Sequence, residues 1–249
     1  MPTNDWEGNR EFHERIYRTL KRKCPNGAIT QHLIATWTPS DSFCDIIVGG
    51  EAYDQEIASK ENYYDCFKPD FMRIAYTPRN VDKDYRIIPQ FLRSFILFKP
   101  ARVKTWKPDS PDARKAILHM LGCLYVHNIN CWPIYGTEEL VVKARKYRYK
   151  LTDTDYSFYP YWEKNGPVKH IIPEDDTLMA SVYEHGGKYL LAVLNNSTDH
   201  CTAEIQLQGV DSLPCLEVFS DEKTHLNADV LNVPLADREF KLFFFGDTE

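Results

Sequence analysis

A carboxyl group at the end of a predicted strand is the first candidate for chemistry. Glu51 directly follows Gly49-Gly50, which end the apolar segment 44–48. The glycines allow a tight turn and close approach of a ligand, so Glu51 could act as a general acid or base; a solvated loop glutamate is the alternative. Asp45 lies six residues earlier. Six residues of strand span roughly 20 Å, so the two carboxyl groups share a site only if the strand ends early.

Further polar and aromatic side chains lie in or just after predicted strands. His32 could donate to a ligand hydroxyl or stabilise a carboxylate, and a core histidine is the alternative. Arg73 could hold a carboxylate in the fork geometry of its guanidinium or close a structural ion pair. His127 and the two asparagines after it precede Trp132, whose ring offers a stacking face. A polar loop with a core tryptophan is the alternative for this group.

Other recognised chemical motifs are missing from the sequence. It has no HxH or HExxH pattern, so no metal site is predicted. It also has no phosphate loop, G-x-S-x-G elbow or Cys/His nucleophile signature, and no cofactor is predicted. Residues 143–150 form a basic patch with interleaved tyrosines, which could contact a phosphate backbone. Because the chain is acidic overall, a solvated helix face is favoured and nucleic acid is not expected as a partner.

Strands and helices alternate in the first 150 residues. The apolar patterns predict helices over 7–24, from Ser110-Pro111 to about 121, and over 137–151, and strands over 28–34, 44–48, 71–76 and 124–127. The apolar segment 87–98 is ambiguous, and we interpret it as mostly helix or irregular structure. Alternation of this kind predicts parallel strands with helical crossovers.

The pattern changes after residue 151. Short strands with turn signals are predicted near 178–185, 188–195, 202–208, 215–219, 230–235 and 239–245. Gly186-Gly187 between the first two fits a two-residue hairpin turn in which both positions need positive φ. We therefore predict an α/β unit over residues 1–155 and an antiparallel β-sandwich over residues 156–249.

Length, charge and cysteine content agree with two units. The 249 residues carry a net charge of −6, divided into +6 over residues 1–150 and −12 over residues 151–249. The seven cysteines are odd in number and lack CxxC spacing, which indicates free thiols. The N-terminus lacks the apolar core of a signal peptide and no apolar run is long enough for a membrane helix, so we expect a cytoplasmic protein without membrane contact.

Several of these segments together resemble a known family. They are His32 after a strand, Phe43-Cys44-Asp45, Gly49-Gly50-Glu51, Asp70-Phe71-Met72-Arg73 and Phe158-Tyr159-Pro160-Tyr161-Trp162. The chain resembles the C-terminal half of a bacterial glycoside-hydrolase-like (β/α)8 barrel followed by that superfamily's C-terminal β-sandwich. A complete barrel needs about 250 residues and eight strands. The resemblance therefore implies a partial (β/α) barrel of about four βα units.

The resemblance also implies where a site would lie, because such barrels place it at the carboxyl ends of the strands. Glu51 becomes the first candidate for a catalytic carboxyl group and Asp45 the second. The implied substrate-binding residues are His32, Trp37, Tyr53, Arg73, His127 and Trp132. The aromatic segment 158–162 could be a sugar platform or the apolar contact between the two units.

The implied activity is hydrolysis of a glycosidic bond by carboxyl acid/base chemistry. The alternative is a non-catalytic carbohydrate-binding or assembly module that has kept the fold. The expected partners are a carbohydrate ligand and either a separate N-terminal half or a second copy of the chain, since a partial barrel has open strand edges.

Overall fold

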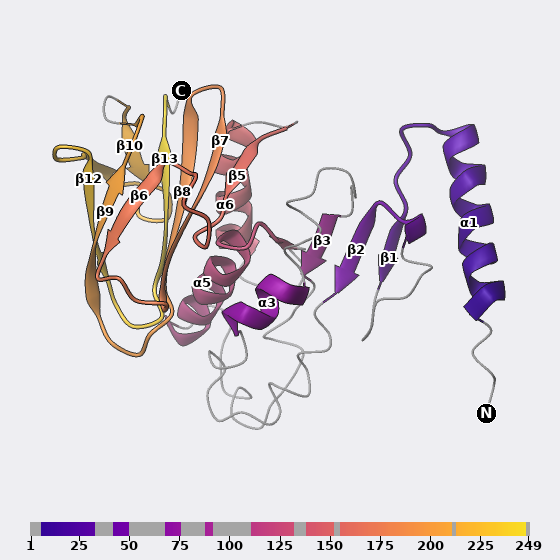
Figure 1. The fold of residues 1–249 in the computed structure, drawn as a ribbon, viewed down its shortest axis with the longest axis horizontal. Helices are drawn as coiled ribbons and strands as arrows, with labels where there is room; N and C mark the ends of the chain where they lie inside the picture. Colours follow the sequence, from indigo (N-terminus) through magenta and orange to yellow (C-terminus); the bar gives the residue numbers. More distant parts are fainter. Residues whose placement is uncertain are drawn as a thin grey trace.

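The structure is a computed structural model that describes residues 6–32, 42–49, 68–75, 88–91, 111–131, 138–151, 155–210 and 213–247. The antiparallel strands lie at one end of the molecule and the first helix at the other (Figure 1). Among the described residues, no helix combines the length and the apolar character needed to span a membrane.

The first part of the chain contains a four-stranded parallel sheet. Helix α1 (Trp6–Lys23) precedes β1 (Thr30–His32), and the sheet order is β1-β2-β3-β4. The other strands are β2 (Ile46–Gly49), β3 (Ile88–Phe91) and β4 (Asn130–Cys131). Each neighbouring pair runs parallel, which confirms the predicted pairing mode. Strand β3 falls in the ambiguous segment 87–98, where we expected mostly helix or irregular structure; that expectation was wrong for these four residues.

The predicted strand 71–76 is wrong, because its described residues, 71–75, belong to helix α3 (Pro69–Ala75). Pro69 occupies the first helical position and Asp70 lies in the first turn, both of which favour a helix start. The Met72 amide donates to the Lys68 carbonyl oxygen at 3.0 Å, and the Met72 side chain is fully buried.

The predicted strand 124–127 is also wrong. Helix α5 (Pro111–Tyr125) continues through Gly122, and β4 begins only at Asn130. A Cβ atom at Gly122 would lie 2.8 Å from both Leu194 Cδ1 and Phe240 Cβ. Glycine is therefore required at this position of α5 so that the helix can approach the neighbouring sheet closely.

The second part of the chain is antiparallel, as predicted. The nine strands that the structure describes here are β5 (Ser157–Tyr159), β6 (Val168–Ile172), β7 (Leu178–His185), β8 (Lys188–Asn195), β9 (Cys201–Leu207), β10 (Cys215–Glu217), β11 (Lys223–Thr224), β12 (Val230–Leu235) and β13 (Phe240–Phe245). They form a large sheet, β11-β10-β13-β8-β7-β5, and a small sheet, β12-β9-β6. Gly186 and Gly187 have φ values of 57° and 78°, which confirms the predicted turn.

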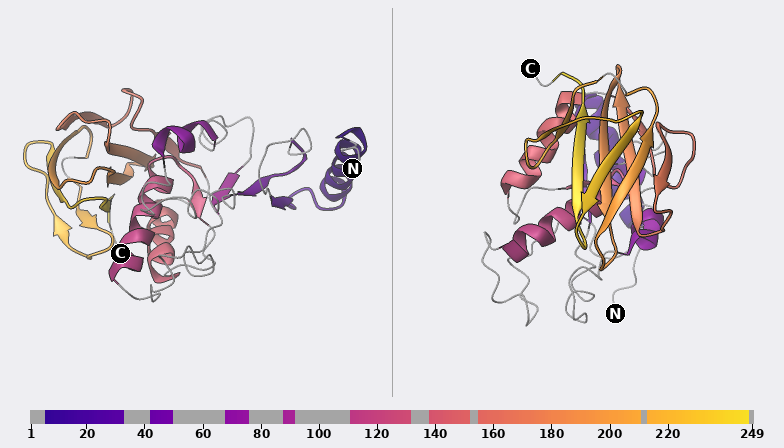
Figure 2. Two further views of the ribbon diagram at one scale, coloured as in Figure 1. Left: turned by 90° about the horizontal axis from the view of Figure 1, so that it is seen from below. Right: turned by 90° about the vertical axis from the view of Figure 1, so that its left-hand side faces the viewer.

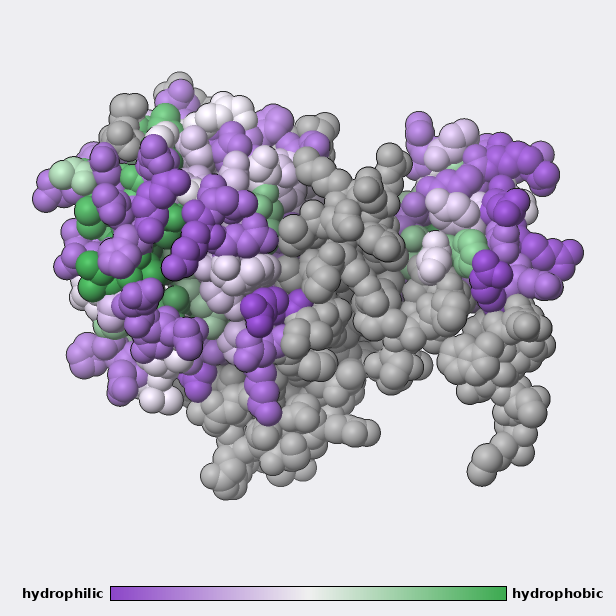
Figure 3. All heavy atoms as spheres, in the orientation of Figure 1, coloured by the Kyte–Doolittle hydropathy of each residue, from purple (hydrophilic) through white to green (hydrophobic). Residues whose placement is uncertain are grey.

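The large sheet is covered on both faces. Apolar residues of one face meet the small sheet in a core that includes Val182, Val193 and Ile205. Its other face packs on α5 and α6 (Glu138–Leu151) in a second core that includes Leu124, Tyr183 and Phe244. Figure 2 shows the two helices on one side of the antiparallel sheets, and in Figure 3 hydrophobic side chains show between hydrophilic ones over β6 and β9.

Candidate functional site

The edge of the parallel sheet predicted to carry the site is described only up to the strand ends. His32 is the last residue of β1 and is paired in register with Val48 of β2. Strand β2 ends at Gly49, so Glu51 follows its carboxyl end by two residues in the chain. Glu51 itself lies outside the described residues, as do Trp37, Tyr53 and Trp132.

Asp45 lies at the opposite, amino end of β2. Its Oδ1 accepts a hydrogen bond from Lys21 Nζ at 2.9 Å, and its Oδ2 accepts one from the Ile29 amide at 2.9 Å. These contacts tie α1 and the segment before β1 to the start of β2. They favour a structural role for Asp45 at the start of β2 over a role in catalysis.

Arg73 lies on helix α3 and not, as expected, on a strand of the parallel sheet. Its guanidinium makes a 3.4 Å ion pair with Asp70, one helical turn earlier. The same group lies 5.9 Å from the ring centroid of Trp162. The structure therefore brings Arg73 to the aromatic segment after β5.

His127 comes after helix α5 and before β4, so its expected position after a strand was wrong. The Nδ1–H group donates to the Cys123 carbonyl oxygen at 2.6 Å, and Nε2 lies 3.3 Å from the Tyr161 hydroxyl. The imidazole stacks on Trp162 with ring centroids 5.8 Å apart. Burial lowers the pKa of His127 to about 4, so the ring is neutral near pH 7. His127 thus links α5 to the aromatic segment from a buried position.

Arg148 is a central residue that sequence reasoning missed. We expected residues 143–150 to be a solvated helix face, yet Arg148 points inward. It donates to Asn128 Oδ1 at 2.7 Å, to Asn130 Oδ1 at 2.9 Å and to the Tyr156 hydroxyl. Its guanidinium also lies 4.9 Å from the ring centroid of Tyr183. The side-chain amide oxygens of Asn128 and Asn130 are therefore engaged by Arg148.

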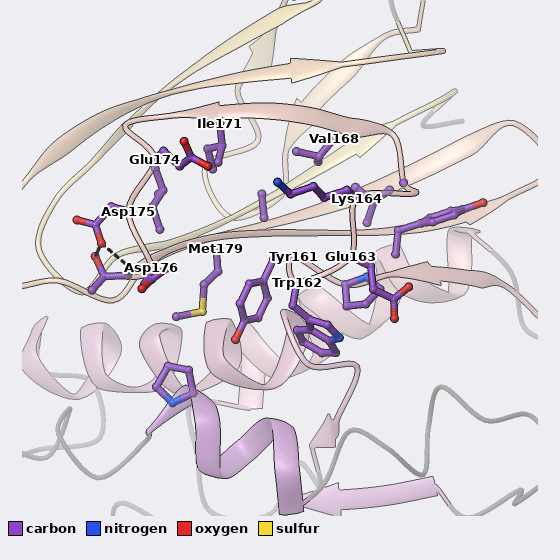
Figure 4. Close-up of a pocket in the computed structure, with 18 of the residues that line it drawn as sticks. Tyr161, Trp162, Glu163, Lys164, Val168, Ile171, Glu174, Asp175, Asp176 and Met179 are labelled. Atoms are coloured by element: carbon purple, nitrogen blue, oxygen red, sulfur yellow. Dashed lines mark hydrogen bonds between the residues drawn. The ribbon is translucent and has the colours of Figure 1, made fainter.

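A pocket of about 690 Å³ lies at the side of the antiparallel sheets, where β6 faces β5 and β7. Its lining also includes part of α3 and the segments between β5 and β6 and between β6 and β7. In Figure 4, Glu174, Asp175 and Asp176 gather toward one end of the pocket, and Met179, Tyr161, Trp162 and Glu163 follow in turn away from them.

The pocket lining carries charges of both signs. The acidic residues are Asp70, Glu163, Glu174, Asp175 and Asp176, and the Lys and Arg residues are Arg73, Lys164 and Lys169. Asp175 Oδ1 accepts hydrogen bonds from the Thr177 amide at 2.7 Å and from the Thr177 hydroxyl at 2.8 Å, which lower the pKa of Asp175. Burial raises the pKa of Tyr161 to about 12, so its hydroxyl stays neutral.

Metal ligands are not clustered in this part of the chain. Among the residues that the structure describes, no group of three or more His, Cys, Asp or Glu side chains could hold a metal ion. Five cysteines in the described ranges, Cys24, Cys44, Cys123, Cys201 and Cys215, are free thiols.

The aromatic segment 158–162 both packs against neighbouring elements and lines the pocket. The Phe158 ring packs on Tyr183 of β7 with centroids 4.9 Å apart, and Trp162 stacks on His127, which follows α5, so these side chains join β5 to β7 and the next segment to the end of α5. Tyr159, Tyr161 and Trp162 also line the pocket. The contacts therefore support an apolar joint and leave a platform role open to the same segment.

No protein-family model matches the sequence, and no curated protein matches it. Among solved structures, an α-amylase from Geobacillus thermoleovorans complexed with acarbose is similar, with a TM-score of 0.61 at 10% identity over 96% of this chain and 58% of that chain. A GH27 β-L-arabinopyranosidase from Geobacillus stearothermophilus has a TM-score of 0.57 at 8% identity over 97% and 62%. A putative α-galactosidase from Bacteroides fragilis has a TM-score of 0.57 at 10% identity over 99% and 53%.

These likenesses concern the fold. The chain spans just over half the length of the solved structures that it matches. The predicted resemblance to glycoside hydrolases is confirmed at the level of the fold, since three differently named enzymes of this kind match nearly all of the chain. The chain has the fold of part of a glycoside hydrolase.

Proposed function

We propose that the chain is a carbohydrate-active, glycoside-hydrolase-like protein in which a partial (β/α) barrel is followed by a β-sandwich. The observation that carries this proposal is the fold likeness over 96–99% of the chain to an α-amylase, a β-L-arabinopyranosidase and a putative α-galactosidase. Parallel strands that alternate with helices, followed by two antiparallel sheets, support the same assignment.

The proposed reaction is hydrolysis of a glycosidic bond with Glu51 as one of the two carboxyl groups that it requires. Strand β2 has a parallel neighbour on each side, and Glu51 follows its carboxyl end, where barrel sites lie. Asp45 is a poor second group, because it precedes the four-residue strand β2, whose length of about 13 Å exceeds the ~5–9.5 Å that separates the carboxyl groups of glycosidases. The second carboxyl group is therefore assigned to another segment of the complete site.

Hydrolysis of aryl glycosides tests this proposal. We expect release of p-nitrophenol from at least one of the α-glucoside, α-galactoside and β-L-arabinopyranoside. The substitution Glu51→Gln should lower kcat/KM by on the order of 10²–10⁴-fold, because it removes an acid/base group while keeping the side-chain shape. Glu204→Gln, at an exposed position of β9, is the matched control and should retain the rate.

The alternative is a carbohydrate-binding or assembly module without catalysis. It is favoured by the same comparisons, since the chain spans only 53–62% of three similar enzymes. A chain that releases no p-nitrophenol from any of the three substrates refutes hydrolysis by the 249-residue chain. Oligosaccharide binding by the same inactive chain would then establish the binding module.

A further inference from the structure

A buried histidine contacts the aromatic segment beside the pocket. His127 follows α5 with its side chain fully buried, and its Nδ1–H group donates to the Cys123 carbonyl oxygen at 2.6 Å. Its Nε2 atom lies 3.3 Å from the Tyr161 hydroxyl, and its ring stacks on Trp162 with centroids 5.8 Å apart. The Tyr161 and Trp162 side chains extend from the segment after β5 toward the helices (Figure 4). His127 is therefore a contact between this segment and the end of α5.

Helix α3 meets the same group of side chains. The Arg73 guanidinium lies 5.9 Å from the ring centroid of Trp162. The Pro69 backbone lies within hydrogen-bonding reach of the His127 imidazole. Pro69, Asp70 and Arg73 also line the pocket, so α3 forms one of its sides. We propose that His127 is a pH-sensitive switch, whose protonation releases α3 from the aromatic segment and opens the pocket on that side.

The packed arrangement suits only the neutral imidazole. Because Nδ1 carries the proton that the Cys123 carbonyl accepts, Nε2 has a lone pair and accepts from the Tyr161 hydroxyl, which is itself neutral. A second proton, on Nε2, would turn this acceptor into a donor and place a positive charge in a fully buried site. Burial disfavours the charged form of a histidine. The packed state therefore resists protonation, whereas a released and hydrated imidazole accepts a proton readily.

The charged groups that face His127 come from α3 and act in opposite directions. Burial is the largest cause that lowers the pKa of His127 to about 4, and the Arg73 guanidinium lowers it further. The carbonyl groups of Cys123 and Pro69 and the Asp70 carboxylate oppose this shift without cancelling it. Because Arg73 and Pro69 both belong to α3, release of this helix removes a positive charge from the imidazole and admits water to it. Release and protonation therefore favour each other.

Proton linkage gives the direction and the size of the effect. A histidine that binds its proton more tightly in the released state favours release as the pH falls. Between the ordinary pKa of about 6.5 and the packed value of about 4, the ratio of released to packed molecules rises by up to about tenfold for each pH unit. From pH 6.5 to pH 4.5 the total rise is about 40-fold. The contact is therefore complete above pH 6.5 and is weakened progressively in acidic solution.

Hydrogen–deuterium exchange of the 249-residue chain between pH 4.5 and pH 7.5, corrected for the intrinsic pH dependence of exchange, tests the proposal. The Met72 amide, which donates to the Lys68 carbonyl oxygen, reports on α3, and the amides of β8 report on the large sheet. We expect the opening of α3 to increase about 40-fold from pH 6.5 to pH 4.5 while β8 stays protected. In the His127→Gln variant the opening of α3 should not change with pH. An unchanged circular dichroism spectrum at pH 7 verifies that this variant is folded.

Arg73→Gln and Lys68→Gln provide a matched pair that decides the question even if His127→Gln does not fold. Each removes one positive charge, but Arg73 faces Trp162, whereas Lys68 is an exposed residue before α3. The first substitution should reduce the rise in opening at low pH, because it removes a like charge beside His127, and the second should leave the rise unchanged. Three results would overturn the proposal: opening of α3 that is independent of pH, an equal change in β8, or equal pH profiles in these two variants. None of these measurements depends on glycoside hydrolysis, so the switch and the proposed function can fail separately.

Discussion

Substitution of Tyr183 by phenylalanine should measure how strongly the end of helix α5 is fastened to the large sheet. The Tyr183 side chain is completely buried, and its hydroxyl donates to the Tyr125 carbonyl oxygen at 2.6 Å. In the phenylalanine variant this carbonyl keeps a longer contact, 3.3 Å from the Asn128 amide. The ring of residue 183 stays under the Arg148 guanidinium, so the substitution removes the hydroxyl and little else.

The expected loss in the free energy of unfolding is about 1–2 kcal/mol. A buried neutral hydrogen bond contributes about 1 kcal/mol, and an acceptor left with weaker partners adds part of its desolvation cost. In a chain of this length, each kcal/mol corresponds to a fall in Tm of about 2–4 °C. Urea unfolding followed by circular dichroism gives the free energy, and an unchanged slope with denaturant shows that only stability has altered.

Tyr149→Phe provides the matched control, because Tyr149 lies on α6 with 62% of its surface exposed. Exposed substitutions of this kind usually stay within ±0.5 kcal/mol. If Tyr183→Phe changes the unfolding free energy no more than Tyr149→Phe does, the hydroxyl does not fasten α5 and the reasoning is refuted.

The remaining predictions concern packing, pH and thiol reactivity. Gly122→Ala should lower the unfolding free energy, because its Cβ would lie 2.8 Å from atoms of the large sheet and overpacking of ~1–3 kcal/mol exceeds the ~1 kcal/mol gained in helix propensity. Burial lowers the pKa values of His119 and His127 to about 4, so the unfolded chain binds protons first and stability should fall from about pH 6.5 toward pH 4, by up to ~1.4 kcal/mol per pH unit for each histidine. Cys24 should be alkylated by iodoacetamide at pH 8 far faster than Cys123, which is buried and whose pKa is raised to about 12.

Each of these three predictions would be contradicted by a specific result. A more stable Gly122→Ala variant would show that the helix can move away from the sheet at little cost. His127→Gln should flatten the pH profile, whereas His185→Gln at an exposed position should not; equal profiles would contradict the assignment. Peptide mapping that finds Cys24 and Cys123 modified at equal rates would contradict the buried position of Cys123.

The antiparallel part was predicted well because its signals are local. Strands β7 and β8 are joined by a two-residue turn that needs positive φ at both positions, and the sequence has glycine at both, Gly186 and Gly187. Parallel pairing of the first strands was also predicted correctly, because strands and helices alternate along the chain.

The errors come from short segments whose conformation is decided by distant contacts. Residues 71–76 are rich in aromatic and branched side chains, yet the Pro69-Asp70 start and the burial of Met72 make residues 71–75 helical. We expected α5 to end near Leu121, but it continues because Gly122 packs against Phe240, 118 residues later in the chain. The local pattern of apolar residues cannot predict a contact between residues so far apart in the chain.

The candidate site was predicted less completely than the fold. His32 was expected at a strand end and is found at one, but Arg73 and His127 were assigned to strands that do not exist. Arg148 lies within a basic stretch of the sequence, and only its position between Tyr147 and Tyr149 indicated an aromatic environment. The pocket depends on β5, β6 and α3 meeting in space, which no spacing along the chain reveals.

The large antiparallel sheet is covered on both faces, so it cannot be separated from the helices without exposing apolar side chains. Because β7, β8 and β13 pack on α5 and α6, a cut between Leu151 and Asp155 would not release the antiparallel sheets as an independent unit. It would uncover an apolar face that includes Tyr183, Leu194 and Phe244. Strand β4 lies between those two helices in the chain and pairs with β3, so the last parallel strand is held by the same helices that cover the sheet. Thermal or chemical unfolding of residues 111–247 is therefore expected as one cooperative transition, in which the antiparallel sheets unfold together with the helices that flank β4.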